Sequence, residues 1–169
     1  EHDVVKVMDF GLVKDTAAGE ETLTRADEIC GSPQTISPEA LKAEAVTRRS
    51  DLYALGAVGC YLLTGKPPFD GSTVVELAAA HLHKPPIPPS ERDASVPQDL
   101  EAVLLACLAK EPGARPATAI AVREQLLACA AAGTWSAGDA AGWWERNAAR
   151  VAATGDGDVG DGDGNGDGV

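Results

Sequence analysis

The stretch from Leu52 to Leu63 limits the possible folds of this chain more than any other, because its 12 residues are apolar on nearly every side of a helix. Ser50 is a typical N-cap, and Gly65, with prolines just beyond it, is a typical helix stop. We therefore predict a helix over residues 51–63. A helix without a polar face is expected in the middle of a domain.

Helices should also dominate the rest of the chain. Thr73 with Glu76 resembles a capping box for a helix that ends near His83. The proline-rich residues 84–89 should then run extended, because a residue before proline avoids the helical conformation. Another helix should open near Ser95, since one apolar stripe at helical spacing follows it: Leu100, Val103, Leu104, Cys107 and Leu108.

Two more helix starts are predicted nearer the C-terminus. Thr118 should cap one helix, and Ser136 with Asp139 should cap another. The last helix carries two of the three tryptophans, which are Trp135, Trp143 and Trp144. Aromatic side chains on a terminal helix most often pack on their own domain, and a docking surface for a partner is the alternative.

The composition favours one globular domain with tails. The chain has 169 residues, of which 44% are hydrophobic, and its net charge is −12. Residues 155–169 hold five aspartates and no basic residue. Nucleic-acid binding is disfavoured, because it requires a basic surface.

The cysteines indicate reduced thiols in a cytoplasmic protein, because they are widely spaced and form no C-x-x-C motif: Cys30, Cys60, Cys107 and Cys129. The longest apolar run is too short to span a membrane. The chain opens at Glu1, without Met and inside an alternating pattern, so we expect it to be a fragment of a longer protein. Its oligomeric state cannot be predicted.

Five short motifs follow one another along the chain. Residues 4–8 read as a short β-strand that ends at the first motif, and a long polar loop follows over residues 16–38. The motifs are D-F-G at residues 9–11, G-S-P at 31–33 with S-P-E at 37–39, S-D-L-Y-A-L-G at 50–56, L-T-G-K-P-P-F at 63–69 and K-E-P-G-A-R-P at 110–116.

In order and spacing these motifs resemble the C-terminal half of the catalytic domain of eukaryotic-like, bacterial-type Ser/Thr protein kinases. The resemblance covers residues 4–131 and implies a mainly α fold, the helical large lobe. We expect this lobe over residues 1–131, with its activation segment at 9–39. An additional helix should occupy residues 132–154, and a disordered Gly/Asp-rich tail residues 155–169.

The resemblance implies roles for individual residues, with ATP and Mg²⁺ as cofactors. Asp9 would be the metal-binding carboxylate, Phe10 would pack inward, and Gly11 would allow the backbone to turn. Residues 16–28 would form an activation loop in which Thr22 and Thr24 are candidate phosphosites.

The resemblance also assigns the segment after the activation loop to substrate docking. This assignment covers Gly31, Ser32 and Pro33, with the Ser32 hydroxyl contacting the catalytic aspartate, which favours Ser/Thr substrates in proteins. Glu39 and Arg115 would form a buried structural pair. Asp51 would accept hydrogen bonds from the catalytic-loop backbone.

Several features depart from the family pattern. Val13 replaces a small residue, Thr35 stands where Tyr or Trp is common, and Glu111 replaces Asp. In the family a G-x-G-x-x-G loop, a V-A-I-K lysine and an H-R-D-x-x-x-x-N catalytic loop precede D-F-G, and none of them lies ahead of D-F-G among these 169 residues. We therefore expect the chain alone to be inactive. A non-catalytic pseudokinase that binds partners is the alternative, although the presence of Asp9 favours catalysis.

Two other signals are interpreted as non-functional. His81 and His83 lie two positions apart and do not share a helix face, so we expect solvated residues at a helix end rather than a metal site. Residues 161–166 match the start of a calcium loop, D-x-D-x-N-G, but the Gly-Asp alternation produces such matches by chance. A flexible acidic linker is the preferred interpretation.

Overall fold

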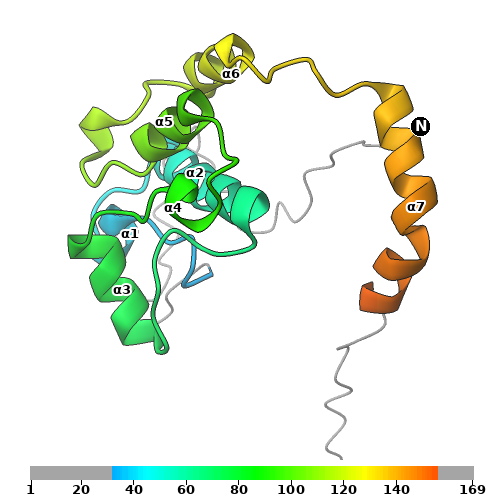
Figure 1. The fold of residues 1–169 in the computed structure, drawn as a ribbon. Helices are drawn as coiled ribbons and strands as arrows, with labels where there is room; N and C mark the ends of the chain where they lie inside the picture. Colours follow the sequence, from blue (N-terminus) through cyan, green and yellow to red (C-terminus); the bar gives the residue numbers. More distant parts are fainter. Residues whose placement is uncertain (1–31, 156–169) are drawn as a thin grey trace, which may run out of the picture. The chain divides into compact units, whose positions relative to one another are not determined.

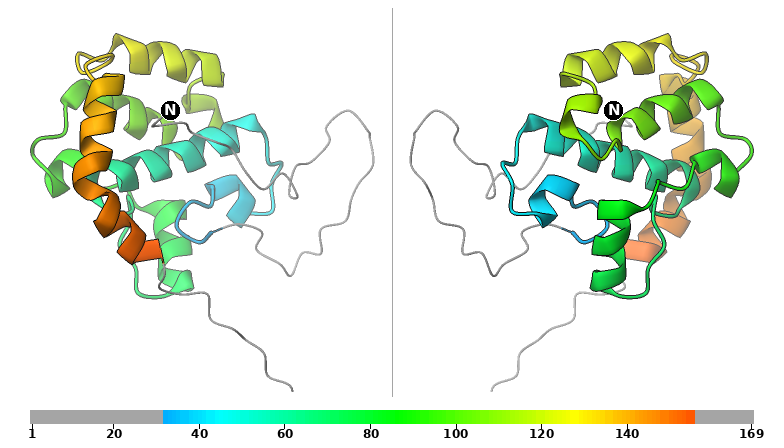
Figure 2. Two further views of the ribbon diagram at one scale, coloured as in Figure 1. Left: turned by 90° about the vertical axis from the view of Figure 1, so that its right-hand side faces the viewer. Right: turned by 90° about the vertical axis from the view of Figure 1, so that its left-hand side faces the viewer.

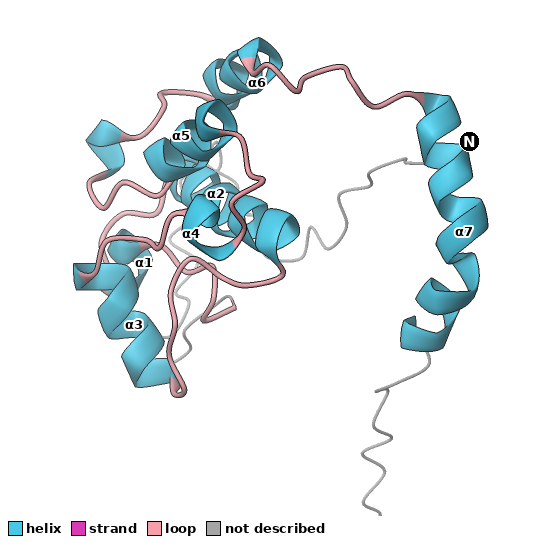
Figure 3. Cartoon of the chain, viewed as in Figure 1, coloured by secondary structure: helices cyan, strands magenta, loops and turns pink. Residues whose placement is uncertain are grey.

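A computed structural model describes residues 32–155 of the chain. They belong to two compact units, residues 32–132 and residues 133–155, and each is described by itself. Both units are helical, and no strand occurs within residues 32–155 (Figure 3). The predicted mainly helical fold is thus confirmed, whereas the strand expected before Asp9 lies outside the described residues.

The larger unit consists of short and medium helices around α2 (Figure 1). Its elements are α1 (Pro38–Leu41), α2 (Arg48–Thr64), α3 (Val74–His83), α4 (Pro89–Arg92), α5 (Gln98–Cys107), the 3-10 helix η2 (Pro112–Ala114) and α6 (Ala119–Ala128). Helix α2 runs through the middle of this unit and packs along α5 (Figure 2). Helix α1 packs against α3, α4 against α2 and α5, and α6 against α5.

Helix α2 begins three residues before its predicted start. Thr47, not Ser50, is its N-cap, and Thr47 Oγ1 accepts a hydrogen bond from the Arg49 amide at 3.3 Å. Ser50 Oγ accepts from the Thr47 amide at 3.1 Å, so two amides at the helix start are satisfied. The predicted stop is confirmed, because Gly65 adopts the left-handed conformation with φ 70°.

Two apolar clusters hold α2 in place. One joins α2 to the segment before α3, to α3 and to α5, through Tyr53, Ala57, Cys60, Phe69, Ala80, Leu104 and Leu108. The other joins α2 to α5 and α6 through Leu52, Val103, Cys107, Val122 and Cys129. The three cysteines in these clusters are buried and form no disulfide with one another, and Cys30 lies outside the described residues. The apolar stripe predicted for α5 faces the core, because four of its residues belong to these clusters: Val103, Leu104, Cys107 and Leu108.

The other predicted helix starts are confirmed at α3 and α6 and wrong at α5. Thr73 Oγ1 accepts from the Glu76 amide at 3.1 Å, and Thr118 caps α6 in the same way. Helix α5 begins after Pro97 without a side-chain cap. Ser95 instead donates its amide and hydroxyl hydrogens to the Asp93 carboxylate, which holds the preceding turn.

The smaller unit contains helix α7 (Ala137–Gly155). Its predicted cap is confirmed, because Ser136 Oγ accepts from the Asp139 amide at 3.2 Å and the Asp139 carboxylate accepts from the Ser136 amide at 2.9 Å. Trp143 and Trp144 contact each other edge to face, with ring centroids 5.1 Å apart. Residues 156–169 of the predicted acidic tail lie outside the described residues.

Candidate functional site

Most of the predicted chemical residues lie outside the described part of the chain. These are Asp9, Phe10, Gly11, Thr22, Thr24 and Gly31, and the roles given to them remain predictions. The structure does describe the end of the predicted docking loop. Residues 32–36 are called the docking segment below.

The docking segment forms a turn whose first residue, Ser32, is exposed and whose last residue, Ile36, is buried. The Thr35 amide donates to the Ser32 carbonyl oxygen at 3.0 Å, and the Gln34 amide donates to Ser32 Oγ at 3.4 Å. Ser32 is exposed, whereas Ile36 is buried in the core. The segment thus presents its serine at the surface while Ile36 anchors it.

Directly after the docking segment, Glu39 in α1 forms the predicted pair with Arg115. Arg115 Nη1 and Nη2 donate to Glu39 Oε1 and Oε2, each at 2.7 Å. Ser50 Oγ donates to Glu39 Oε1 at 2.6 Å. The Glu39 side chain is buried, with an exposed fraction of 2%. The pair therefore connects α1 and α2 to the segment that follows η2.

Arg115 is fully satisfied in its buried position. Besides its bonds to Glu39, it donates to three backbone carbonyl oxygens, those of Ala109 at 2.8 Å, Arg49 at 2.8 Å and Lys110 at 3.0 Å. These five bonds use all five N–H donors of the guanidinium group. The group also lies 4.8 Å from the ring centroid of Tyr53. A charge buried in this way is stabilised by its partners rather than by water.

The electrostatics of this pair favour the ionised carboxylate. Burial by itself raises the pKa of Glu39, but hydrogen bonds from Arg115 and Ser50 outweigh burial and lower the pKa to about 2. Glu39 is therefore negatively charged at neutral pH. Through its bonds to Arg115, Glu39 holds the docking segment and α1 on the helical core.

Asp51 lies exposed in the first turn of α2. A carboxylate there interacts favourably with the positive end of the helix dipole. Its predicted partner, the backbone of a catalytic loop, is not among the 169 residues. The supporting role predicted for Asp51 therefore remains a prediction.

His81 was expected to be solvated, and the structure shows that this is wrong. Its exposed fraction is 1%, whereas His83 is exposed as predicted. Tyr53 Oη lies 2.8 Å from His81 Nδ1, and the ring of Phe69 lies 4.6 Å away, between centroids. Helical spacing gives a signal for this residue, because His81 lies four positions after the apolar Leu77 and so shares a face of α3 with it.

The surroundings of His81 keep its ring neutral. Burial, reinforced by the nearby positive charge of Lys110, lowers the pKa of His81 to about 4. Lys110 Nζ donates to the carbonyl oxygen of His81 at 2.7 Å and to that of Ala80 at 3.2 Å, so it occupies the C-terminal end of α3. Burial in turn lowers the pKa of Lys110 to about 8.

A small hollow of about 130 Å³ lies beside the docking segment. Gln34 and Thr35 form one side, and α2 and the loop after it form the other with Ala57, Val58, Tyr61 and Pro67. The hollow thus combines the polar backbone of a turn with apolar side chains. This combination suits an extended peptide better than a phosphate group.

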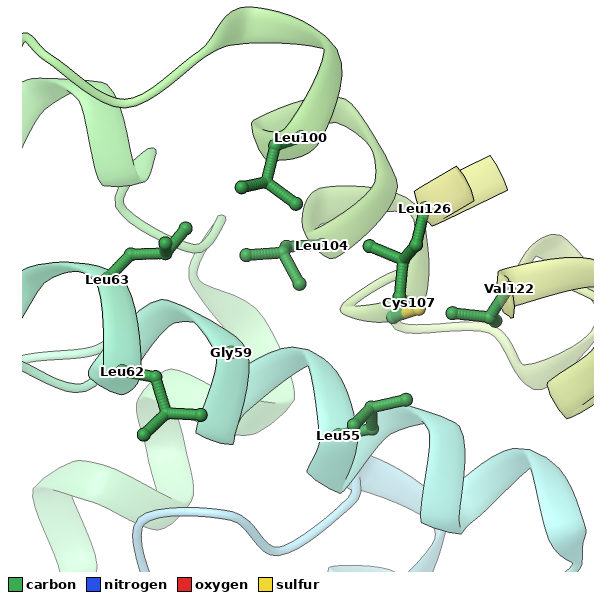
Figure 4. A pocket seen from close by; sticks show the side chains of 9 residues that line it. All are labelled: Leu55, Gly59, Leu62, Leu63, Leu100, Leu104, Cys107, Val122 and Leu126. Atoms are coloured by element: carbon green, nitrogen blue, oxygen red, sulfur yellow. The ribbon is translucent and has the colours of Figure 1, made fainter. Parts of the chain in front are cut away.

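A second pocket, of about 200 Å³, is apolar throughout (Figure 4). Its lining comes from α2, α5 and α6: Leu55, Gly59, Leu62, Leu63, Leu100, Leu104, Cys107, Val122 and Leu126. It offers no polar side chain for chemistry. Leu62 has an exposed fraction of 76%, so α2, although central in this unit, leaves one apolar face open to solvent.

Two features are absent from residues 32–155. No helix in this part is long and apolar enough to cross a membrane. No three His, Cys, Asp or Glu side chains gather there as candidate metal ligands.

Comparison with known proteins identifies the relatives of the chain. The Protein kinase domain family matches residues 1–127. Serine/threonine-protein kinase PknB of Mycolicibacterium smegmatis is 42% identical over 126 residues, which cover 75% of this chain and 20% of that protein. PknB of Mycobacterium tuberculosis is 42% identical over 125 residues, covering 74% and 20%. Serine/threonine-protein kinase pkn3 of Myxococcus xanthus is 41% identical over 132 residues, covering 76% and 24%.

The chain spans about a fifth of the length of these relatives. The match includes the docking segment, the Glu39–Arg115 pair and α2. By sequence, the chain belongs to the protein kinase domain family.

Proposed function

We propose that this chain is part of the helical large lobe of a protein kinase that transfers the γ-phosphate of ATP to serine and threonine hydroxyls of proteins. The observation that carries this proposal is the arrangement of residues 32–39. An exposed turn leads directly into Glu39, which Arg115 fixes with two hydrogen bonds of 2.7 Å. Phosphoryl transfer depends mainly on positioning, and this anchor gives a substrate peptide a fixed surface.

The preference for serine and threonine is supported by two features. Ser32 is exposed at the start of the docking segment, where a hydroxyl is typical of kinases that act on Ser/Thr. The three relatives described above are all named serine/threonine-protein kinases. The hollow lined by Gln34 and Thr35 would then bind part of the substrate peptide. Thr35 stands where Tyr or Trp is common in the family, so the hollow lacks that aromatic side chain.

Asp9 is the proposed metal-binding residue, with Phe10 setting its orientation and Gly11 allowing the backbone to turn. These residues lie outside the described part, so the proposal rests on the motif and on donor chemistry. Carboxylate oxygens are the ligands that Mg²⁺ prefers. When bound, Mg²⁺ and ATP supply the phosphoryl group and neutralise its charge.

Regulation is proposed to act through the loop over residues 16–28. A phosphate on Thr22 or Thr24 adds nearly two negative charges and can order a loop by pairing with basic side chains.

The experiment that tests the proposal identifies the amino acid that is phosphorylated. A chain in which residues 1–169 follow a kinase small lobe and an H-R-D-x-x-x-x-N catalytic loop is incubated with labelled ATP and a protein substrate. We expect phosphoserine or phosphothreonine after hydrolysis. Phosphotyrosine would contradict the assigned specificity, and the absence of transfer would favour the non-catalytic, partner-binding alternative.

A further inference from the structure

The hollow beside the docking segment holds two exposed apolar side chains of α2. Its lining, called the α2 hollow below, consists of Gln34, Thr35, Ala57, Val58, Tyr61 and Pro67. Val58 and Tyr61 lie three positions apart on one face of α2, with exposed fractions of 42% and 52%. Single exposed apolar residues are normal on a protein surface, but two that share a concave site are a candidate contact for a ligand.

The α2 hollow carries no charge. None of its six residues is acidic or basic, although the chain holds 26 acidic residues and 14 lysines and arginines. A charged side chain that entered the hollow would lose water without gaining an ion partner there, which is costly. An aliphatic side chain would instead exchange water for apolar contacts with Val58, Tyr61 and Pro67. The lining therefore favours an apolar occupant over a charged one.

The size of the α2 hollow suits one side chain. Its volume is about 130 Å³. A cavity of about 150 Å³ in a protein interior accommodates one benzene ring. The side chains of leucine, isoleucine and methionine are of similar size, whereas the indole ring of tryptophan is larger and would protrude. The volume thus matches an aliphatic side chain.

Both sides of the α2 hollow are held in place by the fold. On one side, the Thr35 amide donates to the Ser32 carbonyl oxygen at 3.0 Å, and Ile36 next to it is buried. On the other side, Ala57 belongs to the apolar cluster that joins α2 to α3 and α5. Exposed Gln34 adds a side-chain amide that can donate to and accept from a peptide backbone. A preformed site of this kind loses little entropy when a peptide binds.

We propose that the α2 hollow binds an aliphatic side chain of the protein substrate and that Tyr61 determines this specificity. Tyr61 has the largest side chain of the lining and is more exposed than Val58, so it offers the most surface to the occupant. The role of this side chain in phosphorylation rests on the proposed function. The preference of the hollow for an aliphatic over a charged group does not.

The first test measures which substrate side chain is preferred. Residues 1–169, preceded by a kinase small lobe and catalytic loop, are assayed with peptides that hold one serine among alanines. Leucine, arginine, glutamate or tryptophan is placed at one flanking position at a time. At one position, leucine should give a kcat/KM at least about tenfold above arginine or glutamate. The gain should appear in KM, because the contact is the same in the ground state and the transition state.

Two results of this assay would overturn the proposal. One is a profile in which a charged residue equals or exceeds leucine at every position. The other is a preference for tryptophan over leucine at the position where apolar residues are favoured, because the volume of the α2 hollow would then not limit the occupant.

Variants of Tyr61 assign the preference to the α2 hollow. Tyr61→Glu places a carboxylate in the lining, so arginine should exceed leucine at the same peptide position. Tyr61→Lys should favour glutamate there, and Tyr61→Phe should leave the profile unchanged. Ile120→Glu is the matched control, because Ile120 is 67% exposed in α6 and does not line the hollow. An unchanged leucine preference in both charged Tyr61 variants, or the same reversal in Ile120→Glu, would refute the assignment.

The second test requires no phosphoryl transfer. N-acetyl-leucine amide and N-acetyl-arginine amide are titrated into the ¹⁵N-labelled 169-residue protein, and the amide signals of Thr35 and Val58 are followed. Both signals should shift with the leucine probe, at a Kd at least about tenfold below that of the arginine probe. The amide of Leu108, which is buried in the core, should not shift.

Equal affinity for the two probes, or no shift with the leucine probe, would contradict the proposal. If no peptide is phosphorylated in the first test but the leucine probe binds as expected, the proposed function fails and the binding site is retained. If peptides are phosphorylated without a preference for leucine, the proposed function is retained and the present inference fails.

Discussion

Breaking the Glu39–Arg115 pair should destabilise the protein strongly. In Arg115→Ala, Glu39 keeps only Ser50 as a side-chain partner for a carboxylate that is 2% exposed. Three backbone carbonyl oxygens also lose the donor that satisfies them. Removal of one member of a buried ion pair costs about 3–5 kcal/mol. We expect a loss of unfolding free energy in this range.

The double variant Glu39→Leu with Arg115→Met should lose less than the sum of the two single variants, because no unpaired charge remains buried. We expect a coupling energy of about 2 kcal/mol. Urea unfolding followed by circular dichroism measures it. Tryptophan fluorescence is unsuitable, since all three tryptophans lie outside the unit that holds the pair.

Arg92 and Asp70 provide a matched control. Their N–O distance is also 2.7 Å, but their side chains are 12% and 70% exposed. An exposed ion pair contributes less than about 1 kcal/mol, so its double-mutant cycle should give a smaller coupling energy. If the Glu39 and Arg115 losses add to within about 0.5 kcal/mol, the two side chains do not interact as described.

Three further predictions concern other parts of the chain. Gly56→Ala should destabilise by about 1–3 kcal/mol, because its new Cβ would lie 3.1 Å from a carbonyl oxygen of α5. Gly113→Ala, whose new Cβ would meet only Arg49 Nη1 at 4.0 Å, should change urea stability by less than about 0.5 kcal/mol. Acidification from about pH 6.5 to about pH 4 should lower the unfolding free energy, because His81 binds a proton in the unfolded chain before it does in the folded protein. His81→Phe should flatten that part of the profile, and an identical profile would contradict the assignment. Phosphopeptide mapping of an active form should find phosphate on Thr22 or Thr24, and modification confined to other segments would refute that proposal.

Local sequence patterns predicted the helices well and their first residues less well. Thr47 and Ser50 are both good caps three positions apart, so local chemistry does not choose between them. The choice is made by Glu39, which lies far away in sequence and takes the Ser50 hydroxyl as a donor. At α5, the sequence makes Ser95 a plausible cap, but in the structure the Ser95 hydroxyl donates to the nearby Asp93 carboxylate.

The residues of the candidate site that belong to family motifs could be predicted from the sequence. The residue whose position depends on burial could not. The pairing of Glu39 with Arg115 came from the family resemblance, since no local pattern links residues 76 positions apart. His81 lies near the end of α3 and was predicted to be solvated, but its side chain is buried on the inner face of this helix. The hydrogen bond to Tyr53, which makes that burial tolerable, joins two helices and cannot be seen in either alone.

The measurement that tests the kinase assignment most directly is phosphate transfer with and without Asp9. Residues 1–169 alone, the same residues preceded by a kinase small lobe and catalytic loop, and the Asp9→Ala form of that longer chain are assayed with labelled ATP and a basic protein substrate. We predict transfer by the longer chain only, because Asp9 is the proposed Mg²⁺ ligand and the 169 residues contain no catalytic-loop motif. Transfer by residues 1–169 alone, or undiminished transfer after Asp9→Ala, would contradict this account.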